Sequence, residues 1–105
     1  MHAYLVTYHL TKDILKYDSF FDCLNELSDN CNKELFDGCI LIKSGWTTIA
    51  IREQLIKHIQ PSDRLFVCKL NHKDIAGQLP DKSKQWIKEQ IIDKAPSDLS
   101  DQLRK

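Results

Sequence analysis

The first segment with chemical potential is the end of an apolar run over residues 3–10, where Tyr8 is followed by His9. Imidazole titrates near neutral pH, so it can serve as a general base or a general acid. If His9 faces its own copy across a two-fold axis, the pair could cleave RNA by transesterification. His9 is therefore the candidate catalytic residue, and Tyr8 a candidate nucleic-acid contact. The alternative is an exposed strand-end histidine without a role.

The second segment is Lys43-Ser44-Gly45-Trp46, followed by the possible helix N-caps Thr47 and Thr48. Backbone N–H groups at the start of a helix bind phosphate, and a tryptophan ring can stack on a base. Lys43, Ser44 and Trp46 are therefore candidate nucleic-acid-binding residues. The alternative is a tight connection between strand and helix, with the tryptophan packed at the edge of the core.

Charge is balanced overall, with 15 basic and 15 acidic residues, which argues against a uniformly basic, phosphate-binding surface. It is uneven along the chain, because acids prevail over residues 18–37 and bases with histidines over residues 52–73. Arg52 and Arg64 are the candidate phosphate contacts of the basic part; an ordinary solvated surface explains them equally well. Asp63 beside Arg64 indicates a turn with a local ion pair.

Several site classes are not indicated by the sequence. The three glycines are too dispersed for a nucleotide loop, and the four cysteines form no CxxC pair, so neither a zinc site nor a cofactor is expected. The cysteines are expected to be reduced and to pack as small apolar side chains. No apolar run approaches the ~18 residues of a membrane span, and no signal segment is evident. We therefore expect a cytoplasmic protein without a membrane partner.

The elements that must position these residues follow from the spacing of apolar residues. Residues 3–10 and 64–70 have strand character, and residues from Tyr17 onward and after Thr48 have helical spacing. Between the helices lies a hairpin around Asp37-Gly38. The predicted fold is α+β, a ferredoxin-like βαββαβ unit with a four-stranded antiparallel sheet and two helices on one face. We expect one domain over residues 1–94, including a C-terminal helix over about 81–94, and a polar, disordered tail over 95–105.

The hairpin pattern predicts which side chains share a face of the sheet. A type I′ turn at Asp37-Gly38 would pair Leu35 with Ile40 and place Glu34 and Phe36 together on the face without helices, the open face. That face is apolar enough to cost several kcal/mol if left in water, at ~25 cal/mol per Å2. We therefore expect a homodimer through the open face. The alternative is that the chain after residue 70 folds back over it.

The order of these segments resembles a known group. YLVTYHL, YDSFFDCLNEL, ILIKSGWTTIAIREQLIKHI and SDRLFVCKL are similar to small bacterial proteins of the SinR family. That family is in turn similar to the CRISPR-associated adaptation nuclease, the second Cas protein, and to related ferredoxin-like endoribonucleases. The resemblance covers residues 3–70. It implies a homodimer, contact with nucleic acid and, in some members, magnesium-dependent cleavage by an aspartate that follows the aromatic residue ending the first strand.

His9 stands at that aspartate position in this chain. Magnesium prefers hard oxygen ligands, so the family's metal chemistry is not expected here, and Asp13 is the nearest carboxylate that could substitute. The leading functional hypothesis is a dimeric nucleic-acid-associated module, a degenerate nuclease that contacts RNA or DNA. The alternatives are a non-catalytic dimer that recruits a protein partner, and a metal-independent ribonuclease that uses His9.

Overall fold

The computed structural model describes residues 1–94 of the chain, which divide into two compact units, Met1–Leu70 and a second that begins at Asn71. The first unit is α+β, with four strands and two main helices. Its strands are β1 (His2–His9), β2 (Asn32–Phe36), β3 (Cys39–Ser44) and β4 (Arg64–Lys69). Its helices are the short η1 (Ile14–Tyr17), α1 (Asp18–Leu27), α2 (Thr48–Leu55) and the short η2 (Ile56–His58).

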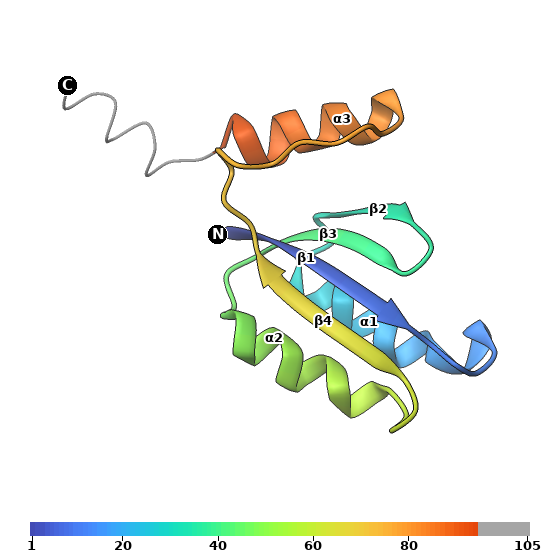
Figure 1. Ribbon diagram of the computed structural model, residues 1–105. Helices are drawn as coiled ribbons and strands as arrows, with labels where there is room; N and C mark the ends of the chain where they lie inside the picture. Colours follow the sequence, from blue (N-terminus) through green and yellow to red (C-terminus); the bar gives the residue numbers. More distant parts are fainter. Residues whose placement is uncertain (95–105) are drawn as a thin grey trace. The chain divides into compact units, whose positions relative to one another are not determined.

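The four strands form one antiparallel sheet in the order β2-β3-β1-β4, which Figure 1 shows. The predicted sequence of strand, helix, hairpin, helix and strand is confirmed. β1 is central and pairs with β3 on one side and β4 on the other. Its apolar residues on both faces are typical of a strand in the interior of a sheet.

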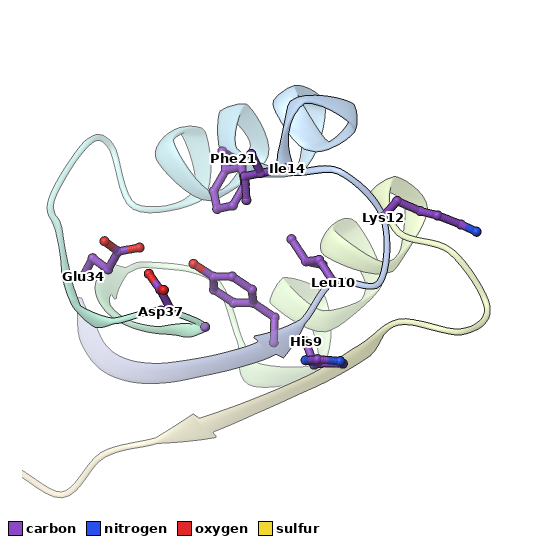
Figure 2. A pocket seen from close by; sticks show the side chains of 9 residues that line it. His9, Leu10, Lys12, Ile14, Phe21, Glu34 and Asp37 are labelled. Atoms are coloured by element: carbon purple, nitrogen blue, oxygen red, sulfur yellow. The ribbon is translucent and has the colours of Figure 1, made fainter.

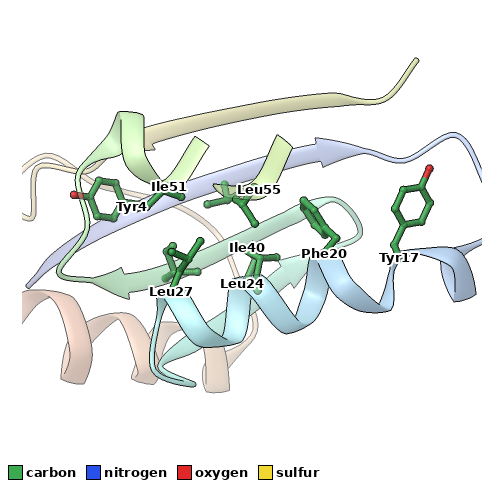
Figure 3. Close-up of a cluster of buried hydrophobic side chains, with 10 residues drawn as sticks. Tyr4, Tyr17, Phe20, Leu24, Leu27, Ile40, Ile51 and Leu55 are labelled. Atoms are coloured by element: carbon green, nitrogen blue, oxygen red, sulfur yellow. The ribbon is translucent and has the colours of Figure 1, made fainter. Parts of the chain in front are cut away.

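Both helices lie on the same face of the sheet, as Figure 1 shows, and close a single core, whose side chains Figure 3 shows. Helix α1 contributes the side chains that recur at helical spacing, and α2 adds two more. The buried members of this core are Tyr4, Val6, Tyr17, Phe20, Leu24, Leu27, Ile40, Ile42, Ile51 and Leu55. Each large apolar side chain buried in this way favours folding by about 1.5–3 kcal/mol.

Helix boundaries follow local signals in the sequence. Thr47 is the N-cap of α2, where its Oγ1 accepts a hydrogen bond from the backbone N–H of Ala50 at 3.1 Å. Helix α1 ends before Asp29 and Asn30, which both adopt positive φ angles of 50° and 61°. Asparagine and aspartate tolerate this conformation better than most residues, so the SDNCN stretch ends the helix.

The predicted register of the hairpin is wrong by one residue on β2. Phe36 pairs with Cys39 as expected, but Glu34 rather than Leu35 lies opposite Ile40, because a β-bulge falls between Glu34 and Phe36. The bulge inserts one extra residue. Glu34 therefore shares the helix-covered face with Ile40, and only Phe36 belongs to the open face.

The predicted type I′ turn is also wrong. Gly38 has φ +80°, whereas Asp37 does not have the positive φ that a type I′ turn requires at its first central position. Gly38 also lies close to β1: the Tyr8 N–H donates to the Gly38 carbonyl at 2.9 Å, and a Cβ at Gly38 would lie 2.6 Å from the Tyr8 carbonyl oxygen. Glycine is therefore required for both its backbone conformation and its lack of a side chain.

The second unit, described by itself, contains helix α3 (Asp81–Ile87), which continues into η3 (Lys88–Ile92), a stretch of π-helix. This confirms the predicted C-terminal helix. An ion pair of 2.9 Å between Lys88 Nζ and Asp93 Oδ2 lies at its end. The predicted disordered tail, residues 95–105, lies outside the described residues. Across residues 1–94, none of the helices combines the length and apolar character needed to cross a bilayer.

Candidate functional site

The open face is the face of the sheet turned away from α1 and α2. Residues opposite one another on paired strands share a face, so the register defines its members. They are Ala3, Leu5, Thr7 and His9 of β1, Lys33 and Phe36 of β2, Cys39, Leu41 and Lys43 of β3, and Arg64, Phe66 and Cys68 of β4.

All the charged side chains of the open face are basic. Lys33, Lys43 and Arg64 belong to it together with His9, and no aspartate or glutamate occurs among its strand residues. The bulge is the reason, because it turns Glu34 to the opposite face. Arg64 and His9 are exposed and Lys33 is half-buried, whereas Lys43 is buried. A chain without net charge therefore has one sheet face whose accessible charges are positive.

Two phenylalanine rings stand exposed on this face. Phe36 and Phe66 are 61% and 64% exposed, which is unusual for such large apolar side chains. Register places them in one row across the sheet, in the order Phe36, Cys39, Thr7, Phe66. Cys39 is buried and Thr7 half-buried, so the two rings are the exposed ends of the row.

The next row of the open face contains His9 and Arg64, which lie opposite one another on β1 and β4. A shallow hollow of about 390 Å3 is lined by both residues and by Thr7 and Phe66. The structure thus brings together two predicted site residues, His9 and Arg64, beside an aromatic ring that the sequence analysis did not single out. Arg64 is not held by the expected ion pair with the Asp63 carboxylate. Instead, the Arg64 Nη1 donates to the backbone carbonyls of Ser62 and Asp63, both at 3.2 Å.

Tyr8 points to the other side of the sheet. Its ring packs edge-to-face on Phe20 and Phe21, with centroid distances of 5.2 and 5.8 Å. Burial, followed by the nearby carboxylates of Glu34 and Asp37, raises the pKa of Tyr8 to about 12. The ring is therefore a neutral member of the aromatic packing under α1, in a position that does not offer its face to a base.

A second hollow, of about 470 Å3, lies on the helix-covered side at the same end of β1. Figure 2 shows Glu34 and Asp37 close together at one side of it, with Phe21 and Ile14 across from them. His9 also reaches its rim, beside β4 and away from the two carboxylates. The negative charge of Glu34 and Asp37 disfavours phosphate here, which leaves the open face as the better nucleic-acid surface.

The Lys43–Trp46 segment lies at the opposite end of the sheet from His9. Ser44 pairs with His2 at the start of β1, seven residues from His9, which at about 3.3 Å per residue is roughly 23 Å. The Ser44 hydroxyl, fully buried, accepts a hydrogen bond from the Trp46 N–H at 3.0 Å. The Tyr4 hydroxyl donates to the Trp46 carbonyl at 2.6 Å. These bonds fit the structural alternative, a tight connection between β3 and α2.

Trp46 itself is about half exposed, and it lines a hollow of about 570 Å3 together with Glu26 and Asp29. Two carboxylates beside the ring oppose a phosphate backbone. Arg52, on α2, lies 3.8 Å from the carboxylate of its neighbour Glu53. The six predicted nucleic-acid contacts therefore do not form one surface, and Arg64 is the one that the structure sets beside His9.

The donor set around His9 does not fit magnesium. His9 offers a nitrogen where the resemblance implies an aspartate. The carboxylate of Asp13 caps η1 by accepting a hydrogen bond from the Leu15 N–H at 3.2 Å. Within residues 1–94, histidine, cysteine, aspartate and glutamate side chains nowhere gather in a group of three or more that could hold a metal ion. No metal-dependent step is therefore derived for this site.

Sequence reasoning missed Lys33, Phe36 and Phe66 as members of the candidate site. Phe66 was detectable. It alternates with Leu65 and Val67, which pack against the core, and it shares its face of the strand with Arg64, whose charge keeps that face out of the core. Phe36 was detectable as well, because the hairpin pattern already placed it on the open face, but Lys33 was not, since its placement depends on the bulge. No protein-family model, curated protein or solved structure that we compared with the chain matches it.

Proposed function

We propose that this protein is a nucleic-acid-associated module that binds through the open face of its sheet. The carrying observation is the combination on that face of two exposed aromatic rings, Phe36 and Phe66, with accessible basic side chains and no carboxylate. Aromatic faces stack on bases and basic side chains neutralise phosphates, and these two interactions together are what binding to nucleic acid requires. The Arg64–His9 pair supplies the phosphate contact next to Phe66.

We also propose that the fold is ferredoxin-like and that the chain is related to the SinR-family proteins that it resembles. The strand order β2-β3-β1-β4 with a helix after β1 and another after β3 supports a ferredoxin-like classification. The same order supports kinship with the SinR-family proteins and with the second Cas protein. A cytoplasmic location is supported by the four cysteines at positions 23, 31, 39 and 68, which are present as thiols, since reduced thiols are typical of that compartment.

Nuclease activity is not part of the proposal. Cleavage of RNA without metal needs a general base and a general acid, and His9 is the one imidazole among the open-face residues. Within the unit Met1–Leu70, His2 lies at the other end of β1 and His58 belongs to η2. A single imidazole beside Arg64 supports binding better than acid–base catalysis.

The test is binding of a labelled single-stranded oligonucleotide at several salt concentrations, with Arg64→Ala and Arg52→Ala as a matched pair. Both variants remove one exposed arginine, but only Arg64 belongs to the open face. Arg64→Ala should weaken binding and reduce the slope of log K against log salt by about 0.7, the value for one phosphate contact on a single strand. Arg52→Ala should leave both unchanged. Equal effects of the two variants, or no binding even at low salt, would contradict the proposal.

A second copy of the chain is the second candidate for this face. Phe36 and Phe66, together with the half-buried Leu5 and Cys68, favour it because an exposed apolar patch commonly marks a protein contact. Cys39 and Leu41 are only 5% and 4% exposed in the single chain, so less apolar area remains to be covered than the sequence predicts. Sedimentation of the protein with and without Phe66→Ala distinguishes this non-catalytic interaction dimer from a nucleic-acid surface.

A further inference from the structure

We infer that the hollow beside β1 and β4 holds the last nucleotide of an unpaired strand, with its terminal phosphate on Arg64 and His9 and its base on Phe66. This inference rests on the proposed function and deepens it, because it names the part of the nucleic acid that is recognised. These three residues line the hollow, which measures about 390 Å3. Ligand pockets span about 300 to 1,000 Å3, so a volume near the lower end suits one nucleotide rather than a longer segment.

The accessible surface around Phe66 ends at β3. The Phe66 ring is 64% exposed on the edge strand β4, and Arg64 and His9 beside it are exposed as well. On β3, by contrast, the three open-face side chains are only 4% to 7% exposed. A ligand in the hollow therefore has no continuous path across the sheet to Phe36, and its contacts come from β1 and β4.

The positive charge of these two strands is concentrated in one row of the open face. Arg64 begins β4 opposite His9, which ends β1, and the other open-face residues of the two strands carry no charge. The nearby Asp63 carboxylate is buried and accepts hydrogen bonds from Thr11 and Tyr17. A nucleic-acid strand that continued along β1 and β4 would find no partner for a second phosphate. The surface therefore suits a single phosphate at one end of the hollow.

Two donor side chains around one phosphate favour a terminal phosphate over an internal one. An internal phosphodiester carries one negative charge, whereas a terminal phosphate carries about 1.5 to 2 at pH 7. Arg64 has a permanent positive charge, and His9 adds an N–H donor from the opposite strand. Both side-chain hydrogen bonds that Arg64 makes within residues 1–94 start from Nη1, which leaves its Nη2 group for a phosphate oxygen.

The contacts for base and phosphate are spaced for one nucleotide. Phe66 and Arg64 are two residues apart on the same face of β4, which is roughly 7 Å along the strand. Side chains this close can contact the base and the phosphate of the same nucleotide. Bases inside a duplex are covered by their neighbours, so the Phe66 ring can stack only on an unpaired base. An unpaired strand end provides both groups together.

The experiment measures competition against a labelled oligo(dT) octamer bound to the full-length chain. The competitors are unlabelled oligo(dT) and oligo(U) octamers with a 5′ phosphate, with a 3′ phosphate, or with hydroxyl groups at both ends, and free thymidine 5′-monophosphate. At least one phosphate-ended octamer should bind roughly 10-fold more tightly than the hydroxyl-ended octamer, as a hydrogen-bonded contact between charged groups predicts.

Variants of the lining residues test each contact. Arg64→Ala should abolish the preference for a terminal phosphate, Arg64→Lys should retain part of it, and His9→Gln should reduce it. Phe66→Ala should weaken binding of every octamer roughly 5- to 150-fold, the loss of one base–aromatic stack, and Phe66→Tyr should restore it.

Two variants on α2 are matched controls. Ile49→Ala removes an apolar side chain that is 65% exposed, and Arg52→Ala removes an exposed arginine. Neither residue lines the hollow, so both variants should leave the octamer affinities and the preference for a terminal phosphate unchanged.

The outcomes separate the inference from the proposed function. If the octamers bind equally with and without a terminal phosphate, or if the preference survives in Arg64→Ala, the inference is wrong and nucleic-acid binding stands. Tighter binding of thymidine 5′-monophosphate than of the phosphate-ended octamers also overturns the inference, because the ligand would then be a free nucleotide. If no octamer binds the unmodified protein even at low salt, the proposed function itself fails.

Discussion

At the scale of single residues, the Asp63 carboxylate joins segments that are distant in sequence. Asp63 is buried, and it accepts hydrogen bonds from the N–H and hydroxyl of Thr11, from the Tyr17 hydroxyl and from the Gln60 N–H, at 2.7 to 3.0 Å. Burial alone would raise the pKa of this carboxyl, but the hydrogen bonds outweigh burial and lower it to about 2. The loop after β1 is thereby fixed to the turn before β4, which sets the position of the neighbouring Arg64.

This network predicts how stability depends on pH. The pKa of Asp63 is lower in the folded chain than its ordinary value of 3.8, so its contribution is present above that value and is lost as the pH falls toward about 2. Tyr17→Phe, which removes one donor, should lower the Tm by several degrees at pH 7 and by much less at pH 2. Thermal melts at both pH values check this. Tyr8→Phe is the control, and an equal Tm loss at the two pH values would contradict the role of the Asp63 charge.

At the scale of elements, the hairpin determines which charges lie on which face. Because side chains alternate along a strand, one extra residue in β2 moves every position beyond it to the other side. The bulge between Glu34 and Phe36 thus removes a carboxylate from the open face. The closeness of Gly38 to Tyr8 then fixes the hairpin turn against the end of β1.

Two glycine substitutions test this closeness. Gly38→Ala should destabilise the protein by at least ~1–2 kcal/mol, the cost of a positive φ for an L-residue, because its Cβ would also meet the Tyr8 carbonyl oxygen. Gly45→Ala is the matched control: nothing lies within 4 Å of the added Cβ, so the free energy of unfolding should change by less than about 1 kcal/mol. Urea denaturation measures both, and similar values for the two variants would contradict the assigned turn.

At the scale of the whole molecule, one core holds the sheet and the two helices of the first unit together. Phe20 is fully buried beneath the sheet, in edge-to-face contact with Tyr8 and Phe21. The charges of the sheet are unevenly divided around this core: its carboxylate, Glu34, lies on the helix-covered face together with Lys69, and the strand residues of the open face carry only basic charges. A neutral chain can therefore still present a surface suited to phosphate.

Removal of the central ring should affect the sheet as a unit. Phe20→Ala should lower the free energy of unfolding by about 3–5 kcal/mol, and Ile49→Ala, at an exposed position, by less than about 0.5 kcal/mol. In native-state hydrogen exchange, the amides of Val6 in β1 and Ile42 in β3 should lose protection equally, since both central strands open only with the core. Unequal losses would show that the sheet does not unfold cooperatively.

The sequence by itself determined the order of the elements and most of the core. Apolar spacing in α1, strand character in β1 and β4, and the Asp37-Gly38 pair are local signals, and local signals specify local structure. The sequence also singled out His9 and Arg64, although not as neighbours.

Tertiary structure alone decided the composition of the candidate site. Pairing between β1 and β4 set His9 opposite Arg64, and the same sheet put Trp46 at its far end. The bulge separated Glu34 from Phe36, and Asp63 found its partners across the fold rather than at Arg64. Such contacts depend on residues up to 55 positions apart, and the face on which a side chain lies changes with a shift of one residue. Periodicity along the chain carries no information about either.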